Sequence, residues 1–178
     1  MQITTQRLQL RKPILADAQA IFDNYASDPE VTRYLSWPTH TTLADTRAFI
    51  EFSDSQWSAS GTGPYLIETQ HNQQIIGSTG LSLDTPYRAS TGYVFARTAW
   101  GNGYAGEVLA AMVELAEKLG VHRLEAITHV RHSVSANVLV KGGFRKEGVL
   151  REHTCFPNLN DSTPQDICMF GRTARTAA

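Results

Sequence analysis

Two glycines stand directly before a long amphipathic segment, in the stretch WGNGYAGEVLAAMVELAEKLG that runs from Trp100 to Gly120. Glycine is a poor helix former, so its presence there needs another reason. The first turn of a helix leaves four backbone N–H groups free and carries a partial positive charge. Gly101, Gly103 and the small Ala105 leave those groups open, which suits a phosphate. The alternative is a tight turn that requires glycine for its positive φ.

The glycines alone do not decide between these two explanations. The stretch GNGYAG nearly matches the dinucleotide fingerprint G-x-G-x-x-G. However, the preceding strand lies in mid-chain, no βαβ pair surrounds it, and no acidic residue follows at the usual distance. No G-K-[ST] follows either, which excludes the Walker pattern.

Hydrophobic spacing predicts the elements that position this loop. After the glycines, one face of the expected helix carries a buried apolar stripe: Ala105, Val108, Leu109, Met112, Ala116 and Leu119. The solvent-exposed face carries Glu107, Glu114, Glu117 and Lys118. Further helical segments are expected over residues 15–26, 27–35, 42–57 and 133–143. Strands are expected over residues 7–12, 64–70, 73–84, 89–97, 123–130, 144–156 and 164–173, the second, third and fourth forming an antiparallel meander. This order predicts one α/β or α+β domain over residues 1–178, built on a mixed sheet, with a frayed tail at residues 173–178.

Composition limits the class of protein. A net charge of −1 argues against a general nucleic-acid binder. Cys155 and Cys168 give neither a disulfide framework nor a metal spacing, and we expect free thiols in or near the core. The N-terminal residues lack an apolar signal region, and no run approaches the ~18 apolar residues of a membrane span. We therefore expect a cytoplasmic protein that binds no membrane.

A second motif accompanies the glycine loop. Taken together, WGNGYAGEVL, RLEAITHV and SVSANVLVKGGFRKEGVL resemble the GNAT superfamily of N-acetyltransferases, and more closely the branch that acetylates ribosomal-protein N-termini. The resemblance covers almost the whole chain. It implies a mostly antiparallel sheet with a splayed strand pair, flanking helices, and acetyl-CoA as co-substrate.

The resemblance also implies which residues meet acetyl-CoA. The pantetheine arm would lie along the backbone of Val94, Phe95 and Ala96, where an N–H near Val94 would polarise the thioester carbonyl. The pyrophosphate would lie on the amides of Gly101, Asn102, Gly103, Tyr104, Ala105 and Gly106. His132 stands where the family has Asn and would still donate to the pantetheine. Lys141 lies where a phosphate of CoA would be met.

Acid–base groups depart from the family pattern. Leu139 replaces the tyrosine that protonates the departing thiolate in many members. In the branch that the chain resembles, a serine at the position of Ser135 takes that part, so the resemblance makes Ser135 the leading acid candidate, with a helix N-cap as its alternative role. Ser90 replaces the usual base, a glutamate. Proton removal is expected to pass through water held by Ser90, or to use Glu68, His129 or Glu152. Since an α-amino group has a pKa near ~8, only modest help is required.

The acceptor cleft is expected between the early helices and the last hairpin. The resemblance places Tyr34, Trp37 and His40 on one rim, and His153, Cys155 and Phe156 on the other. The expected reaction is acetyl transfer to a primary amine by direct attack in a ternary complex, with no metal, by a monomer or homodimer. The alternatives are a non-catalytic acyl-CoA-binding module and a nucleotide-binding protein of another fold.

Overall fold

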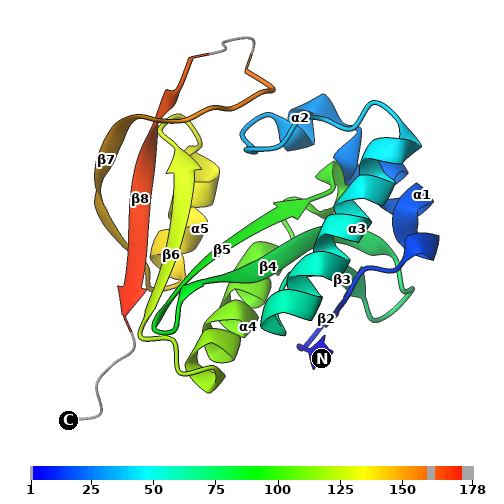
Figure 1. The fold of residues 1–178 in the computed structure, drawn as a ribbon, viewed down its shortest axis with the longest axis horizontal. Helices are drawn as coiled ribbons and strands as arrows, with labels where there is room; N and C mark the ends of the chain where they lie inside the picture. Colours follow the sequence, from blue (N-terminus) through cyan, green and yellow to red (C-terminus); the bar gives the residue numbers. More distant parts are fainter. Residues whose placement is uncertain (1, 160–162, 174–178) are drawn as a thin grey trace.

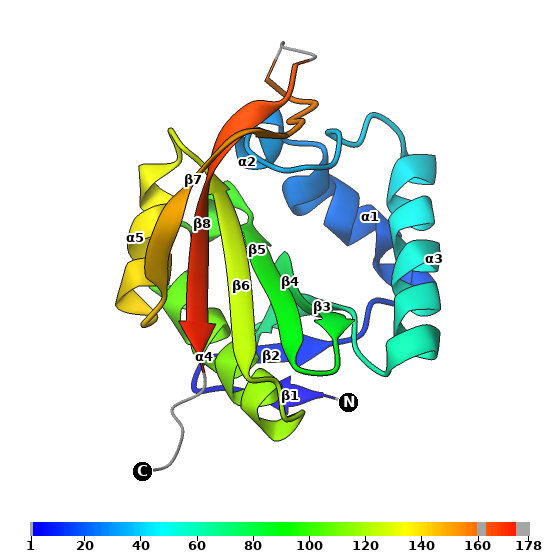
Figure 2. The same ribbon diagram turned by 60° about the vertical axis from the view of Figure 1, so that its left-hand side comes forward.

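One eight-stranded sheet organises the chain in the computed structural model, which describes residues 2–159 and 163–173. The strand order is β1-β2-β3-β4-β5-β6-β8-β7, and every neighbouring pair is antiparallel except β5 and β6 (Figure 1; β1 is labelled in Figure 2). The strands are β1 (Ile3–Thr4), β2 (Leu8–Arg11), β3 (Pro64–Thr69), β4 (Ile75–Thr85), β5 (Arg88–Phe95), β6 (Arg123–His129), β7 (Arg145–Thr154) and β8 (Gln165–Thr173). The predicted meander is confirmed as β3-β4-β5, and the predicted mixed fold class is confirmed.

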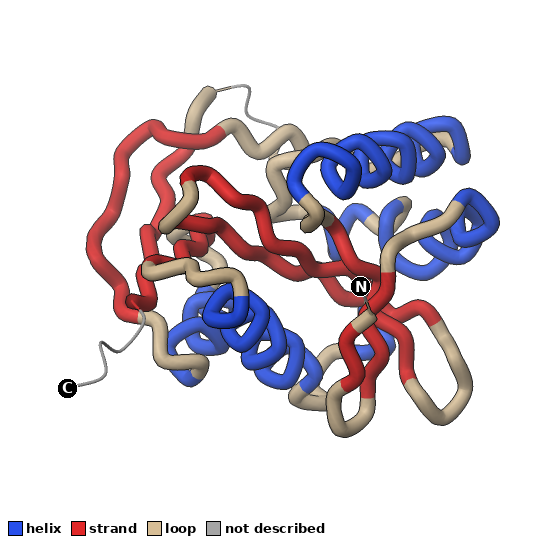
Figure 3. Tube along the Cα trace, turned by 60° about the horizontal axis from the view of Figure 1, so that its bottom comes forward, coloured by secondary structure: helices blue, strands red, loops and turns tan. Residues whose placement is uncertain are grey.

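Helices cover both faces of this sheet. They are α1 (Ala18–Ile21), α2 (Pro29–Thr32), α3 (Leu43–Ser60), α4 (Tyr104–Lys118) and α5 (Ser133–Lys141). Figure 2 shows α4 and α5 on one side and α1 and α3 on the other, and Figure 3 shows helices on both sides of the strands. Two buried clusters match these layers: Val108 and Met112 of α4 pack with Leu124 of β6, whereas Ile21 and Ile50 of α1 and α3 pack with Leu66, Val94 and others.

Helix α4 follows the predicted apolar stripe closely. Val108, Leu109, Met112 and Ala116 are buried, as expected. Leu119 is exposed, because the helix ends at Lys118 and the chain turns at Gly120. Glu107 also differs from the expectation of a solvated side chain, since its carboxylate accepts hydrogen bonds from Thr5 Oγ1 and Arg7.

The first helical region differs from the single helix expected over residues 15–26. It begins with a 3-10 turn at Leu15–Asp17, continues as α1, and widens into a π-helical turn at Phe22–Ala26. The Phe22 carbonyl accepts from both the backbone N–H and the hydroxyl of Ser27, which holds the wide turn. The short β1 was missed because two residues give no measurable alternation.

Strands β5 and β6 diverge after a short contact. Arg88, Ala89 and Ser90 pair in parallel with Arg123, Leu124 and Glu125, and the pairing stops there although both strands continue (Figure 1). The expected splayed pair is therefore present. The open part of the pair is bounded by residues 93–95 of β5 on one side and by residues 127–128 of β6 on the other.

The remaining expectations concern the chain ends and the thiols. Thr173 belongs to β8, contrary to a frayed tail from that residue, and residues 174–178 lie outside the described residues. Both cysteines are free, but Cys155 is exposed and only Cys168 lies in the core. Within the described residues, the structure has no helix of the length and apolarity that a membrane crossing requires.

Candidate active site

A cavity of about 1080 Å³ opens at the divergence of β5 and β6. It runs from α5 through the gap between the strands to the surface between α3 and the loop that follows α2. Its walls include the aromatic side chains of Tyr25, Tyr34, Trp37, Phe49, Phe52, Tyr93 and Phe156. Among the described residues, the carboxylates that line it are Asp45 and Glu125, and no lysine or arginine does.

The glycine loop before α4 satisfies both explanations offered by the sequence. Gly101 and Gly103 have φ values of +77° and +76°, so the turn itself requires glycine. A Cβ added at Gly101 or Gly106 would meet no atom of the described residues within 4 Å, so these residues leave the space over the loop open. Within the same part of the chain, no side chain caps the start of α4. An anion thus has both room and uncapped amides.

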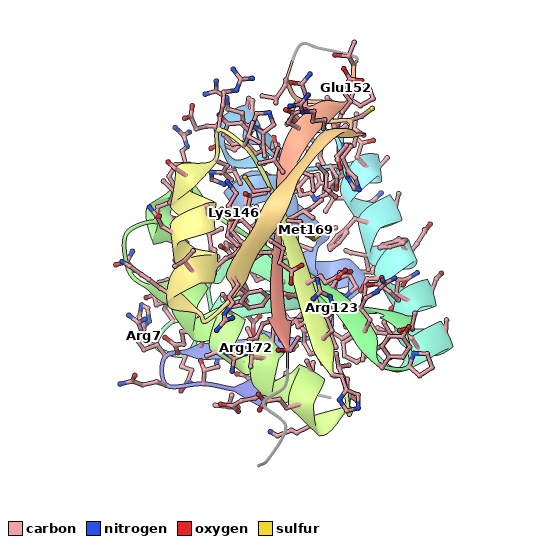
Figure 4. The ribbon with its side chains drawn as sticks, turned by 90° about the vertical axis from the view of Figure 1, so that its left-hand side faces the viewer. Arg7, Arg123, Lys146, Glu152, Met169 and Arg172 are labelled. Carbon is pink, nitrogen blue, oxygen red and sulfur yellow. The ribbon has the colours of Figure 1, made fainter. Side chains whose placement is uncertain are left out.

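Arg7 fixes this loop from the N-terminal strands, although the sequence analysis did not single it out. Its Nη1 donates to the Asn102 carbonyl at 2.9 Å, and its Nε donates to Glu107 Oε2 at 2.7 Å. The guanidinium lies 4.5 Å from the ring centroid of Tyr104 (Arg7 is labelled in Figure 4). Burial would raise the pKa of Glu107, but the hydrogen bonds from Thr5 and Arg7 outweigh it and lower that pKa.

The end of β5 presents backbone groups to the gap. The Ala96 N–H donates to Ile76 O on β4, so strand alternation directs the Phe95 N–H toward β6 and the Val94 N–H toward β4. The amide that faces the gap near Val94 is therefore that of Phe95. The Phe95 carbonyl already accepts from Trp100 Nε1 at 2.8 Å, which ties the glycine loop to the strand.

Helix α5 brings two candidate residues to the cavity. His132 occupies the N-cap position, so Ser135 lies in the first turn and is not the cap that the alternative proposed. Both residues line the cavity, whereas Lys141 is exposed at the far end of the helix and does not. Burial lowers the pKa of His132, and the neighbouring His129 lowers it further. Neutral imidazole is thus favoured there.

Of the base candidates, Ser90 alone lines the cavity. Glu68 lies elsewhere, with its carboxylate held by Arg11 in an ion pair that also includes Asp17. His129 is buried between the rings of Tyr34 and Phe156, with centroid distances of 5.0 Å to each. Glu152 is exposed on β7, away from Met169 and Arg123 (Figure 4).

A carboxylate nevertheless stands beside Ser90. The parallel register pairs Ser90 with Glu125 of β6, and both side chains line the cavity. Glu125 binds Arg123 Nε at 2.5 Å, and Arg123 also binds Glu147 outside the cavity. Glu125 carries no local signal in the sequence, because Ser90 lies 35 positions away and only the strand register brings the two residues together.

The acceptor rims are partly as expected. Tyr34, Trp37, His40 and Phe156 line the cavity, whereas His153 and Cys155 are exposed and do not. Asn158 joins the two rims: its Oδ1 accepts from Thr39 N–H at 2.8 Å, and its Nδ2 donates to the Thr32 and Trp37 carbonyls at 2.8 and 2.9 Å. Over residues 2–159 and 163–173, no three His, Cys, Asp or Glu side chains gather as metal ligands would.

Comparison with known proteins agrees with this architecture. A family model described as an acetyltransferase (GNAT) domain matches residues 7–145. The N-acetyltransferase p20 of Bacillus licheniformis, itself uncharacterized, is 30% identical over 152 residues, covering 84% of this chain and 85% of that protein. Another uncharacterized N-acetyltransferase, YoaA of Bacillus subtilis (strain 168), is 30% identical over 171 residues and 94% of each chain.

Solved structures share the fold at lower identity. RimL, a ribosomal L7/L12 alpha-N-protein acetyltransferase in complex with coenzyme A, superposes with a TM-score of 0.84 at 20% identity, over 97% of this chain and 98% of that one. The microcin C7 self-immunity acetyltransferase MccE, in complex with acetyl-CoA and AMP, gives 0.84 at 17% identity, over 95% and 93%. The match of the family model to most of the chain, together with the relatives at 30% identity, shows that this protein belongs to the GNAT family and is an acetyl-CoA-dependent acetyltransferase.

Proposed function

We propose that the protein transfers the acetyl group of acetyl-CoA to a primary amine, either a peptide N-terminus or a small amine, by direct attack while both substrates are bound. The observation that carries this proposal is the gap between β5 and β6. The cavity at this gap is lined by residues of α5 and by residues of α3, so it reaches both faces of the sheet. A thioester in the gap is therefore within reach of an amine in the cavity.

The donor would bind along the loop and the edge of β5. The amides of residues 101–106 would receive the pyrophosphate, and the backbone of Val94, Phe95 and Ala96 would lie against the pantetheine arm. The Phe95 N–H, which faces the gap, would polarise the thioester carbonyl. His132 would donate to the pantetheine from the start of α5, and Lys141 would meet a phosphate near the surface.

The acceptor would be uncharged or cationic apart from its amine. Tyr34, Trp37 and Phe156 offer apolar contacts. Asp45 places negative charge at the rim, and Glu125, whose charge is partly balanced by Arg123 and Arg88, adds a carboxylate at the inner end. Because no lysine or arginine among the described residues lines the cavity, a phosphorylated or strongly acidic acceptor would be repelled. This charge pattern favours a peptide N-terminus, as the RimL-like branch would use, over a nucleotide-bearing acceptor.

Little base strength is required for the reaction. An α-amino group with a pKa of about 8 is partly neutral at pH 7, so water held beside Ser90 and Glu125 suffices to accept its proton. Ser135 would protonate the departing thiolate. Family membership favours this enzyme over a non-catalytic acyl-CoA-binding module, and the absence of a dinucleotide fold disfavours a nucleotide-binding protein.

Calorimetric titration with acetyl-CoA, with NAD and ATP as controls, tests the donor site. We expect micromolar binding of acetyl-CoA and none of the controls. A panel of peptides with free N-termini and of small amines, followed by thiol release and by the mass of the product, then tests the acceptor. An N-terminally blocked peptide is the matched control. Failure of every amine in the panel would contradict the proposed acceptor class. The cytoplasmic location and the monomeric or dimeric state stay predictions.

A further inference from the structure

A tyrosine hydroxyl reaches Ser135 from the sheet rather than from the helix. Tyr93 of β5 points toward α5, and its Oη lies 3.1 Å from Ser135 Oγ and 3.3 Å from the Ser135 carbonyl oxygen. Both side chains line the cavity, as does Leu139 one turn later on α5. The Tyr93 phenol therefore lies at the same part of the cavity as Leu139, whose apolar side chain has no proton to donate.

The hydrogen-bond geometry permits proton transfer out of this pair. The phenol has a single hydrogen, which can be donated to the Ser135 carbonyl oxygen at 3.3 Å or to Ser135 Oγ at 3.1 Å, and the contact between the two hydroxyls can run in either direction. When the phenol O–H is directed at Ser135 Oγ, the serine hydroxyl hydrogen is free to point into the cavity. Burial raises the pKa of Tyr93 and the hydrogen bond to Ser135 lowers it, so the phenol holds its proton at neutral pH.

Serine alone is a poor proton source. An alcohol is a much weaker acid than a thiol, whose pKa is about 8.5, so an isolated serine would not give up its proton to a thiolate. A phenol is a much stronger acid than an alcohol, and it stays the stronger acid although burial raises the pKa of Tyr93 above the ordinary value of about 10. A serine hydroxyl in contact with a phenol can pass a proton on as it receives another.

We propose that Tyr93 supplies the proton that leaves with the CoA thiol, and that the hydroxyl of Ser135 carries it. This inference rests on the proposed function. As the amine nitrogen bonds to the acetyl carbon, the carbon–sulfur bond breaks and its electron pair stays on sulfur. Sulfur takes the Ser135 proton, and Ser135 takes the Tyr93 proton. The phenolate then recovers, through solvent, the proton that the amine lost, so the protein returns to its starting state.

A double-mutant cycle tests the relay. Tyr93→Phe, Ser135→Ala and the double variant should each lower kcat by about 100-fold, with equal losses because the two hydroxyls act as one unit. The Kd for acetyl-CoA, measured by calorimetry, should stay within about twofold of the wild type. Tyr87→Phe, which removes an exposed phenol from the turn between β4 and β5, is the matched control and should keep full turnover.

Absorbance titration of the tyrosines gives a second measurement that needs no acceptor. The difference between wild type and Tyr93→Phe isolates the Tyr93 phenol, and Ser135→Ala should raise its pKa by removing the hydrogen bond. Unchanged kcat in Tyr93→Phe, or independent losses that multiply in the double variant, would overturn the relay. If the wild-type protein acetylates any amine, the proposed function stands even when these measurements overturn the relay.

Discussion

At the scale of single residues, the glycines of the loop have separable roles. Gly101 and Gly103 are required by their positive φ, so a substitution there strains the turn as well as filling the space. Gly106 lies inside α4 without positive φ, and a Cβ there meets nothing within 4 Å. Gly106 is therefore the position that tests anion binding without damage to the fold.

Gly106→Glu should lower the affinity for acetyl-CoA by about tenfold or more, since it places a carboxylate where the pyrophosphate is proposed to bind. The melting temperature should stay equal or rise, because an acidic residue suits the first turn of a helix. Calorimetry and thermal unfolding provide the two measurements. Gly148→Glu on β7, another glycine with free space around it, is the control. Unchanged affinity in Gly106→Glu would remove the pyrophosphate from this loop.

Glu125 is the residue through which the cavity would attract a cationic amine. Glu125→Gln should raise KM for the amine about five- to tenfold, because a charge at the inner end of the cavity is lost, and should leave the Kd for acetyl-CoA unchanged. Glu147→Gln is the matched control: Glu147 shares Arg123 with Glu125 but does not line the cavity. Equal effects of the two substitutions would assign Glu125 a structural role alone.

The sequence was informative at this scale where local geometry decides. Ser90, His132 and Ser135 line the cavity, and the glycine loop does not line it but is tied to the end of β5 by the hydrogen bond from Trp100 to Phe95. Short motifs set such turns and helix starts, so the sequence could indicate them. Glu68 and Glu152 were candidates by residue type, but the carboxylate of Glu68 is held by Arg11, Glu152 is exposed on β7, and neither lines the cavity. Tyr93 and Glu125 were missed. A contact between β5 and α5 brings Tyr93 to Ser135, and the register of β5 with β6 brings Glu125 to Ser90, and neither contact can be read from local sequence.

At the scale of elements, one asparagine connects the two rims of the cavity. Asn158 joins the loop after α2 to the connection between β7 and β8 through hydrogen bonds to Thr32, Trp37 and Thr39. Asparagine suits this position because its amide donates and accepts at once. Periodicity predicted most helices and strands of the chain but gave no indication of this contact.

Asn158→Ala should lower the free energy of unfolding by about 2–4 kcal/mol, since several part-buried hydrogen bonds lose one partner. It should also raise KM for the amine more than it changes the Kd for acetyl-CoA, because the acceptor rims lose their connection. Urea unfolding and steady-state kinetics measure the two effects. Asn158→Asp keeps the acceptor and loses the donors, so an intermediate loss is expected. A loss of acetyl-CoA affinity equal to the change in KM would argue against separate rims.

At the scale of the whole molecule, three histidines make stability depend on pH. Burial lowers the pKa values of His40, His129 and His132 below those of the unfolded chain. Below a pH of about 6.5 the unfolded state then binds more protons than the native state. The free energy of unfolding should therefore fall as the pH drops from about 7.5 to 5.5, well above the range where carboxylates titrate.

Urea unfolding at several pH values measures this slope. His40→Asn and His132→Asn should each make it shallower, because each removes one group that protonates more readily in the unfolded chain. The carboxylates of Asp45, Glu107 and Glu147 have lowered pKa values in the folded protein. Their contribution to stability is therefore present above the pKa values of the unfolded chain and is lost only as the pH falls through the lowered values. Stability that rises on acidification to pH 5.5 would contradict the assignment.

The strand order has a consequence for biosynthesis. Strand β8 is inserted between β6 and β7, so β6 has no partner on that side until β8 has been synthesised. The donor loop and the meander can assemble earlier, from contacts nearer in sequence, whereas the second acceptor rim waits for the last hairpin. A nascent chain thus exposes an unpaired β6 edge and gains its acceptor site last. Until β8 emerges, this open edge is available for aggregation and for binding by chaperones.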